Sequence, residues 1–186
     1  FDLLRLVPCH VPNHRNLTLC SAVQRVAMLE LACERDEKIV VDEIEIRRGG
    51  ISYAVDTLKQ FKQEYPEANF FFVLGSDSFD SLPQWHKWQD LFELCHFAIL
   101  NRASFDISES TRIATAFDLR KVKSNKELFA APSGKIIVVE DFDYPLSSSQ
   151  VRARLGANES MDGFLDESVA RYIRSNNLYH SEVVRN

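Results

Sequence analysis

Cysteine is scarce in this 186-residue sequence, and the cysteines that are present form no pattern. The four of them, Cys9, Cys20, Cys33 and Cys95, lie far apart and make no CxxC pair. Disulfide-stapled secreted domains and zinc sites use denser spacings than this. The cysteines therefore favour free thiols in a reducing compartment over a disulfide framework or a zinc site.

A metal site near the N-terminus lacks the spacing that it would need. Cys9, His10 and His14 are close in sequence, but Pro12 stands between the two histidines. Proline disrupts the helix that would bring residues i and i+4 onto one face. No residue of the sequence is predicted to bind a metal.

Long apolar runs and a surplus of basic residues are absent as well. No run approaches the roughly 20 apolar residues of a membrane-spanning helix, and no signal peptide is visible. The net charge of −5 disfavours DNA or RNA as the main partner. These absences predict a cytoplasmic protein without a membrane or nucleic-acid partner. A small phosphorylated ligand needs only a local cluster of donors and is compatible with this charge.

The sequence does contain enough apolar residues, 45%, to build one full core, so residues 1–186 are predicted to form a single domain. The unbroken apolar run FFFVL at 70–74 predicts a strand buried on both faces. Further strands are expected at 3–7, 39–41, 44–46, 96–100 and 135–139, and helices at 21–33, 53–64, 150–155 and 166–179. This alternation predicts an α/β fold with a parallel sheet and helices on both faces. Residues 103–133 are expected to be a surface insertion and 160–186 a C-terminal helical part.

The residues that follow the 70–74 run suit a nucleotide ligand. Ligands of parallel sheets bind beyond the carboxyl ends of the strands, where Gly75, Ser76 and Asp77 are expected. Glycine lets the backbone approach a ligand, and the Asp77 carboxylate can accept hydrogen bonds from ribose hydroxyls. Trp85 offers a flat face for an aromatic ring.

A second group of polar residues precedes the helix predicted at 150–155. Ser147, Ser148 and Ser149 stand at its N-terminus, and Arg152 lies in its first turns. Free N–H groups at a helix N-terminus, with hydroxyls and an arginine, make a phosphate site. An ordinary serine cap with a solvated arginine gives the same pattern, so both interpretations stay open. The pair Arg47 and Arg48 likewise fits a basic surface turn.

Five segments resemble the bacterial nicotinate mononucleotide adenylyltransferases. These are VPCHVPNHR (7–15), RRGGISYAVDTL (47–58), FVLGSDSFDSLPQWHKW (72–88), LSSSQVR (146–152) and YIRSNNLY (172–179). The resemblance implies a Rossmann-like nucleotidyltransferase that moves AMP from ATP to nicotinate mononucleotide, giving nicotinic acid adenine dinucleotide and pyrophosphate, with Mg²⁺ accompanying ATP.

The resemblance also implies roles for individual residues. Ser52 and Tyr53 would hold the pyridine carboxylate, and Trp85 would stack on the pyridine ring. Asp77 would lie near the ribose and Arg102 near the mononucleotide. Ser147, Ser148, Ser149 and Arg152 would bind the ATP phosphates.

One part of the family pattern has no counterpart in this sequence: an opening strand, a glycine-rich turn and a first helix with a His-x-Gly-His signature. The resemblance therefore implies a domain without its first strand and first helix, and catalytic histidines that precede Phe1. The polypeptide from Phe1 onward is then expected to be poorly active by itself. Ala54, where many members have threonine, leaves the preference for the acceptor open.

Two other functions fit the same residues. A related adenylyltransferase could use nicotinamide mononucleotide or phosphopantetheine as the acceptor. Without the opening segment, the chain could also be a nucleotide-binding module that does not catalyse a reaction. Comparing the activity with different acceptors would identify the first alternative. Binding of ATP without turnover would identify the second.

Overall fold

The structure is a computed structural model that describes residues 1–12, 20–101, 111–140, 142, 148–157, 159–161 and 163–179. Its residues group into two compact units. The terminal unit comprises Phe1–Ser52 and Pro145–Asn186, and the central unit comprises Tyr53–Tyr144. That the whole chain forms a single domain stays a prediction.

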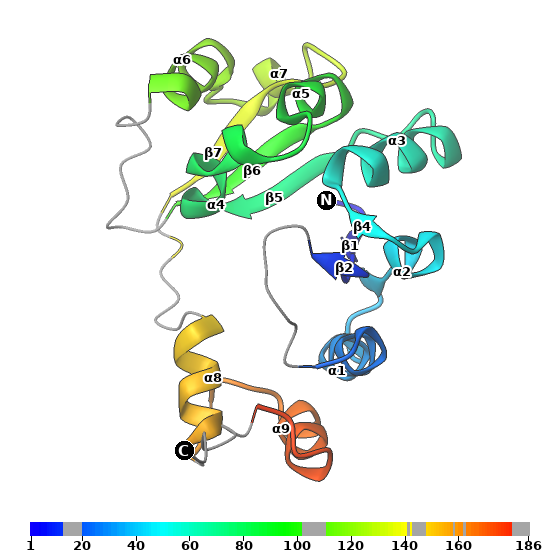
Figure 1. Cartoon of the computed structure of the whole chain (residues 1–186). Helices are drawn as coiled ribbons and strands as arrows, with labels where there is room; N and C mark the ends of the chain where they lie inside the picture. The colour runs from blue at the N-terminus through cyan, green and yellow to red at the C-terminus, as the bar shows by residue number, and fades with distance from the viewer. Residues whose placement is uncertain are drawn as a thin grey trace. The chain divides into compact units, whose positions relative to one another are not determined.

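Short parallel strand pairs and flanking helices make up the terminal unit (Figure 1). Strand β1 (Leu4–Leu6) pairs with β3 (Ile39–Val41), and β2 (Val11–Pro12) pairs with β4 (Ile51–Ser52), both in parallel. Helix α1 (Ala22–Cys33) packs against β3 and against α9 (Glu167–Ser175). Helices α2 (Ile44–Arg48) and α8 (Ser148–Gly156) complete the unit.

The predicted start of α1 is confirmed. Ser21 accepts a hydrogen bond from the Gln24 N–H, and the Gln24 side chain accepts one from the Ser21 N–H. This reciprocal pair satisfies two N–H groups that the helix leaves open at its start. Behind it, Cys20 packs with Val169 and Ile173 of α9 in a small apolar core.

The strand predicted at 44–46 is wrong, because these residues begin helix α2. Alternating isoleucines favoured a strand, but the Asp42 carboxylate accepts from the Ile44 N–H two residues on, forming a turn that leads into the helix. The same carboxylate pairs with Arg5 at 2.7 Å and with Arg47 at 3.0 Å. Gly49, at φ +71°, ends the helix. Arg47 is therefore a structural partner of Asp42.

The central unit is built on one parallel sheet of three strands, β5 (Phe71–Gly75), β6 (His96–Leu100) and β7 (Ile136–Val139) (Figure 1). Its helices are α3 (Ala54–Glu64), α4 (Ser76–Asp80), α5 (Leu91–Leu94), α6 (Thr111–Arg120) and α7 (Asn125–Leu128), with 3-10 turns at Leu82–Gln84 and Trp88–Asp90. Phe79, Leu82, Leu91 and Phe97 form the centre of the core. Every strand pair that the structure describes is parallel, as predicted for an α/β fold.

Strand β5 is less buried than the sequence predicted. Only Leu74 of the strand is buried, and Val73 is 38% exposed. In the three-stranded sheet β5 is an edge strand, with a hydrogen-bonded neighbour, β6, on one side. By contrast, β6 lies between two strands and is buried along nearly its whole length.

The described part of 103–133 is joined to the core. Ile113 of α6 is fully buried, and Leu128 of α7 is 4% exposed. The Val122 N–H also donates to the Ile136 carbonyl of β7. From residue 111 onward this segment therefore packs with the sheet, where the sequence had predicted a surface insertion.

None of the helices in the described ranges is long and apolar enough to cross a membrane. The longest, α1, has 12 residues, against the roughly 20 that a bilayer requires.

Candidate active site

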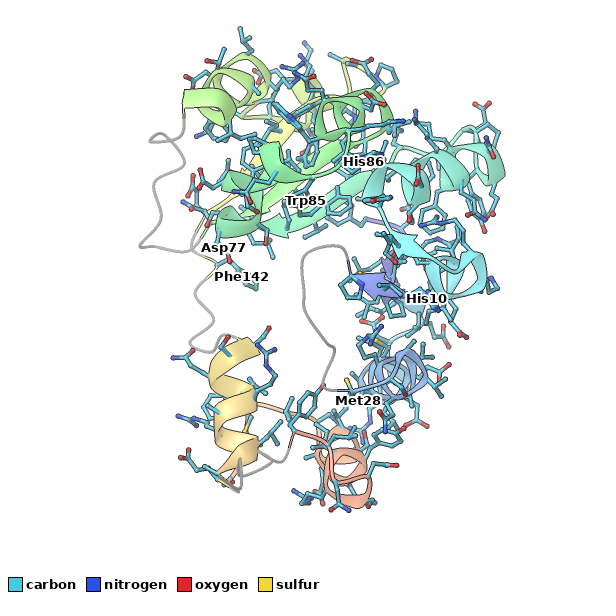
Figure 2. The ribbon with its side chains drawn as sticks, viewed as in Figure 1. His10, Met28, Asp77, Trp85, His86 and Phe142 are labelled. Atoms are coloured by element: carbon cyan, nitrogen blue, oxygen red, sulfur yellow. The ribbon has the colours of Figure 1, made fainter. Side chains whose placement is uncertain are left out.

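Gly75 and Asp77 lie at the carboxyl end of β5, as predicted. The Asp77 carboxylate is exposed, and its Oδ1 folds over Gly75, 2.6 Å from where a Cβ on that residue would stand. Only glycine leaves room for this arrangement. Gly75 thus sets the direction of a carboxylate at the sheet edge where ligands of parallel sheets bind. Asp77 lies in the first turn of α4 (Figure 2).

Two polar residues, Ser76 and Asn101, follow the carboxyl ends of β5 and β6, and no individual role was predicted for either. Ser76 is 1% exposed, and its hydroxyl has no hydrogen-bond partner within the described structure. Asn101 donates from Nδ2 to Glu140 at 2.9 Å, but its buried Oδ1 has no partner there. Gly75 of β5 pairs with Leu100 of β6, so Ser76 and Asn101 each come directly after one residue of this pair. The signal for Ser76 was its place between Gly75 and Asp77.

An aromatic group brings together residues predicted to bind the mononucleotide. The rings of Tyr53 and His86 lie 4.3 Å apart at their centroids, tilted by 34°. Trp85, which directly precedes His86, is half-buried and packs edge-to-face on Phe72, with the ring centroids 5.8 Å apart. Tyr53 and the Trp85 turn are therefore neighbours in the central unit, and Figure 2 labels both Trp85 and His86 there. No role was predicted for His86, although it directly follows Trp85.

Ser52 lies in the terminal unit, where its hydroxyl is already engaged. Its Oγ accepts from the backbone N–H of His10 at 2.9 Å. The His10 ring is within hydrogen-bond distance of the Gly50 carbonyl, with Nδ1 at 3.0 Å. Ser52 keeps its own hydroxyl hydrogen for another acceptor.

Helix α8 begins at Ser148 and carries the residues predicted to bind phosphate. Ser148 and Ser149 are exposed in its first turn, and Arg152 donates to the Ser149 hydroxyl at 3.2 Å. The Tyr179 hydroxyl lies 3.3 Å from the Cys20 thiol. Burial and this hydrogen bond raise the pKa of Tyr179 to about 12, while Arg152 and Arg25 oppose the rise. Arg152 thus lies within electrostatic reach of Tyr179.

Arg102 and Ser147 lie outside the described residues, so their predicted roles stay predictions. Asp77 and Trp85 belong to the central unit, whereas Ser148, Ser149 and Arg152 belong to the terminal unit. That both groups bind the substrates of one reaction also stays a prediction.

The four cysteines carry free thiols. Burial raises the pKa of the Cys95 thiol to about 12, which leaves it protonated and unreactive near neutral pH. Among the described residues, no three or more histidine, cysteine, aspartate or glutamate side chains are grouped closely enough to hold a metal ion.

Comparison with known proteins assigns the chain to a family. The cytidylyltransferase-like family matches residues 1–154. A protein of Hahella chejuensis named probable nicotinate-nucleotide adenylyltransferase is 37% identical over 177 residues, covering 95% of this chain and 81% of its own. A protein of Pseudoalteromonas atlantica with the same name is 36% identical, covering 94% and 80%.

This chain belongs to the nicotinate-nucleotide adenylyltransferase family. The predicted resemblance is thereby confirmed.

Solved structures agree with this family at the level of the fold. The nicotinic acid mononucleotide adenylyltransferase of Plasmodium falciparum, complexed with NaAD, matches with a TM-score of 0.70 at 20% identity. The match covers 96% of this chain and 82% of that one. The predicted nucleotidyltransferase type of α/β fold is confirmed for this adenylyltransferase.

Proposed function

We propose that the protein transfers AMP from ATP to nicotinate mononucleotide, releasing pyrophosphate and nicotinic acid adenine dinucleotide. The observation that carries this proposal is similarity along nearly the whole chain to proteins named for that enzyme. The group formed by Tyr53, His86 and Trp85 supports an acceptor that contains an aromatic ring.

The reaction needs no nucleophile from the protein. A phosphate oxygen of the mononucleotide attacks the α-phosphorus of ATP, a new P–O bond forms, and the bond to the β-phosphate breaks, so that pyrophosphate leaves. Catalysis then consists of positioning two anionic substrates and stabilising charge on the transferring group. Mg²⁺ enters with ATP as part of the co-substrate and neutralises phosphate charge.

In this proposal one group of residues binds the mononucleotide and another binds ATP. Trp85 stacks on the pyridine ring, Ser52 and Tyr53 hold its carboxylate, and Asp77 accepts from the ribose hydroxyls. Arg102 lies near the mononucleotide. Ser147, Ser148, Ser149 and Arg152 bind the ATP phosphates. Free ATP and nicotinate mononucleotide are metabolites of the cytoplasm, which is where the protein is proposed to act.

The acceptor is tested by measuring pyrophosphate release with ATP and each of three candidates: nicotinate mononucleotide, nicotinamide mononucleotide and phosphopantetheine. We expect the highest kcat/KM with nicotinate mononucleotide. A higher value with either of the others would replace the proposed acceptor. Binding of ATP by the intact protein without turnover of any acceptor would point to a binding module instead.

The role of Trp85 is tested by Trp85→Ala. Lost stacking should raise the KM for the mononucleotide about 2- to 12-fold and leave the KM for ATP unchanged. A matched Trp85→Phe variant, which keeps a flat ring, should recover most of the loss. A rise in the KM for ATP alone would indicate that Trp85 contacts ATP and not the mononucleotide.

A further inference from the structure

His10 is held on several sides in the terminal unit. Its backbone N–H donates to the Ser52 hydroxyl at 2.9 Å, and its ring Nδ1 lies 3.0 Å from the Gly50 carbonyl. A carbonyl oxygen can only accept, so Nδ1 carries the hydrogen and donates. His10, the residue before β2, is therefore hydrogen-bonded to both ends of the segment that leads from Gly50 to Ser52.

The other side of His10 is fixed by helix α1. Arg25 of α1 donates to the carbonyls of Cys9 and His10, and also to the Cys20 carbonyl at 3.0 Å. The guanidinium group presents several donors in a rigid plane, which suits it to joining separate pieces of backbone. His10 therefore has its carbonyl fixed by helix α1, its N–H fixed by Ser52 of β4 and its ring fixed by Gly50, the residue before β4.

The turn that His10 holds has little stiffness of its own. Gly49 and Gly50 both lie at φ +71°, in the region that glycine adopts without strain, and no atom lies within 4 Å of where their Cβ atoms would be. Strand β4 consists of two residues and pairs with Val11 and Pro12. Because Pro12 has no N–H, the ladder there offers few hydrogen bonds. The bonds to His10 are thus a large share of what orients Ser52.

The bond from the His10 N–H also polarises the Ser52 hydroxyl. A hydroxyl that accepts one hydrogen bond becomes a better donor through its own hydrogen. A fixed donor of this kind favours a carboxylate, which only accepts, over a carboxamide, which presents N–H₂ donors as well.

We propose that His10 is a positioning residue for the acceptor: by fixing Gly50 and Ser52 it directs the Ser52 hydroxyl at the carboxylate of the pyridine ring and so contributes to the choice of nicotinate over nicotinamide mononucleotide. This inference rests on the proposed function.

The test compares His10→Leu, which removes the ring donor, with His10→Asn, whose amide can donate to the same carbonyl. For His10→Leu we expect the KM for nicotinate mononucleotide to rise about three- to tenfold. The kcat and the KM for ATP should stay within a factor of two, and the ratio of kcat/KM for nicotinate over nicotinamide mononucleotide should fall. His10→Asn should restore the acceptor KM, which a loss of packing alone would not allow.

A double-mutant cycle with Ser52→Ala makes the test specific. If His10 acts through Ser52, then His10→Leu should change the acceptor KM less in the Ser52→Ala background than in the wild type. Arg171→Leu provides a control on the same unit, because the Arg171 side chain is 70% exposed and pairs with Glu167 on the surface of α9. Its kinetics should match those of the wild type.

The outcomes separate the two proposals. A wild-type enzyme that forms no dinucleotide from nicotinate mononucleotide refutes the proposed function. An active wild type whose acceptor KM and selectivity are unchanged by His10→Leu refutes the role of His10 alone. Equal increases in the KM values for ATP and the acceptor, or effects that simply add in the cycle, would also overturn it.

Discussion

The rings of Tyr53 and His86 lie 4.3 Å apart, a contact between the residue before α3 and the turn that carries Trp85. Their contact ties this turn to the start of α3. Because Trp85 directly precedes His86, displacement of His86 would disturb the surface proposed to bind the pyridine ring.

The first prediction concerns His86→Ala. Loss of the contact with Tyr53 should raise the KM for the mononucleotide about 2- to 10-fold, because an aromatic pair contributes about 0.5–1.5 kcal/mol. His86 is exposed, so thermal unfolding should change little. His86→Phe, which keeps a ring, is the matched control, and steady-state kinetics with each substrate varied is the measurement. An unchanged KM for the mononucleotide would show that acceptor binding does not depend on the contact between His86 and Tyr53.

The second prediction concerns Gly75→Ala. The added Cβ would stand 2.6 Å from Asp77 Oδ1, so the carboxylate must turn away, although no backbone atom blocks the methyl group. We expect kcat/KM for the mononucleotide to fall about tenfold or more while the melting temperature changes little. Asp77→Ala should reduce activity to a similar extent, and combining both changes should add little. Full activity in Gly75→Ala would show that the direction of the carboxylate is unimportant.

The third prediction concerns Arg152→Ala. Removing a guanidinium that binds phosphate should raise the KM for ATP about tenfold or more, because hydrogen bonds to charged groups contribute about 1.5–3 kcal/mol. Arg154→Ala is a matched control on the same helix, since Arg154 faces Glu159 at 3.8 Å on the surface. Its ATP kinetics should stay at the wild-type level. Identical behaviour of the two variants would remove Arg152 from the phosphate site.

The fourth prediction concerns pH and stability. Burial lowers the pKa of the fully buried His96 imidazole, and the charges of Lys135 and Lys62 add to the effect. The ring Nδ1 accepts from the Lys135 N–H, a bond that only the unprotonated nitrogen can make. The unfolded chain therefore binds this proton more readily, and stability should fall as the pH drops below the unfolded pKa of about 6.5.

The slope that His96 adds can reach about 1.4 kcal/mol per pH unit. Urea unfolding between pH 5 and 8 measures it, with His96→Leu as the comparison. This variant loses a hydrogen bond and should be less stable at every pH, but its slope below pH 6.5 should be smaller. Parallel curves for the two proteins would contradict the assignment.

Much of the secondary structure was predictable because local signals agreed with one another. Ser21 indicated the start of α1, and Val55, Leu58 and Phe61 indicated the buried face of α3. Where the signals were short, tertiary context decided. The isoleucines at 44 and 46 alternate like a strand, but the Asp42 carboxylate starts a helix there.

The site was predictable to the extent that its residues are close in sequence. Asp77 lies just after β5, separated from it by Ser76, and Trp85 follows in the same short segment of the sequence. Long-range partners gave no such signal. Nothing in the sequence indicates that His10 bonds to Ser52, 42 residues away, or that Asn101 bonds to Glu140, because side-chain contacts of this kind depend on strand pairing.

The proposed transfer of AMP is tested most directly by following the α-phosphate of ATP. With ATP labelled at the α-phosphorus and nicotinate mononucleotide as the acceptor, the account predicts that all transferred label appears in the dinucleotide and none in the released pyrophosphate. Label that stays in free AMP, or that requires a different acceptor to leave ATP, would contradict it.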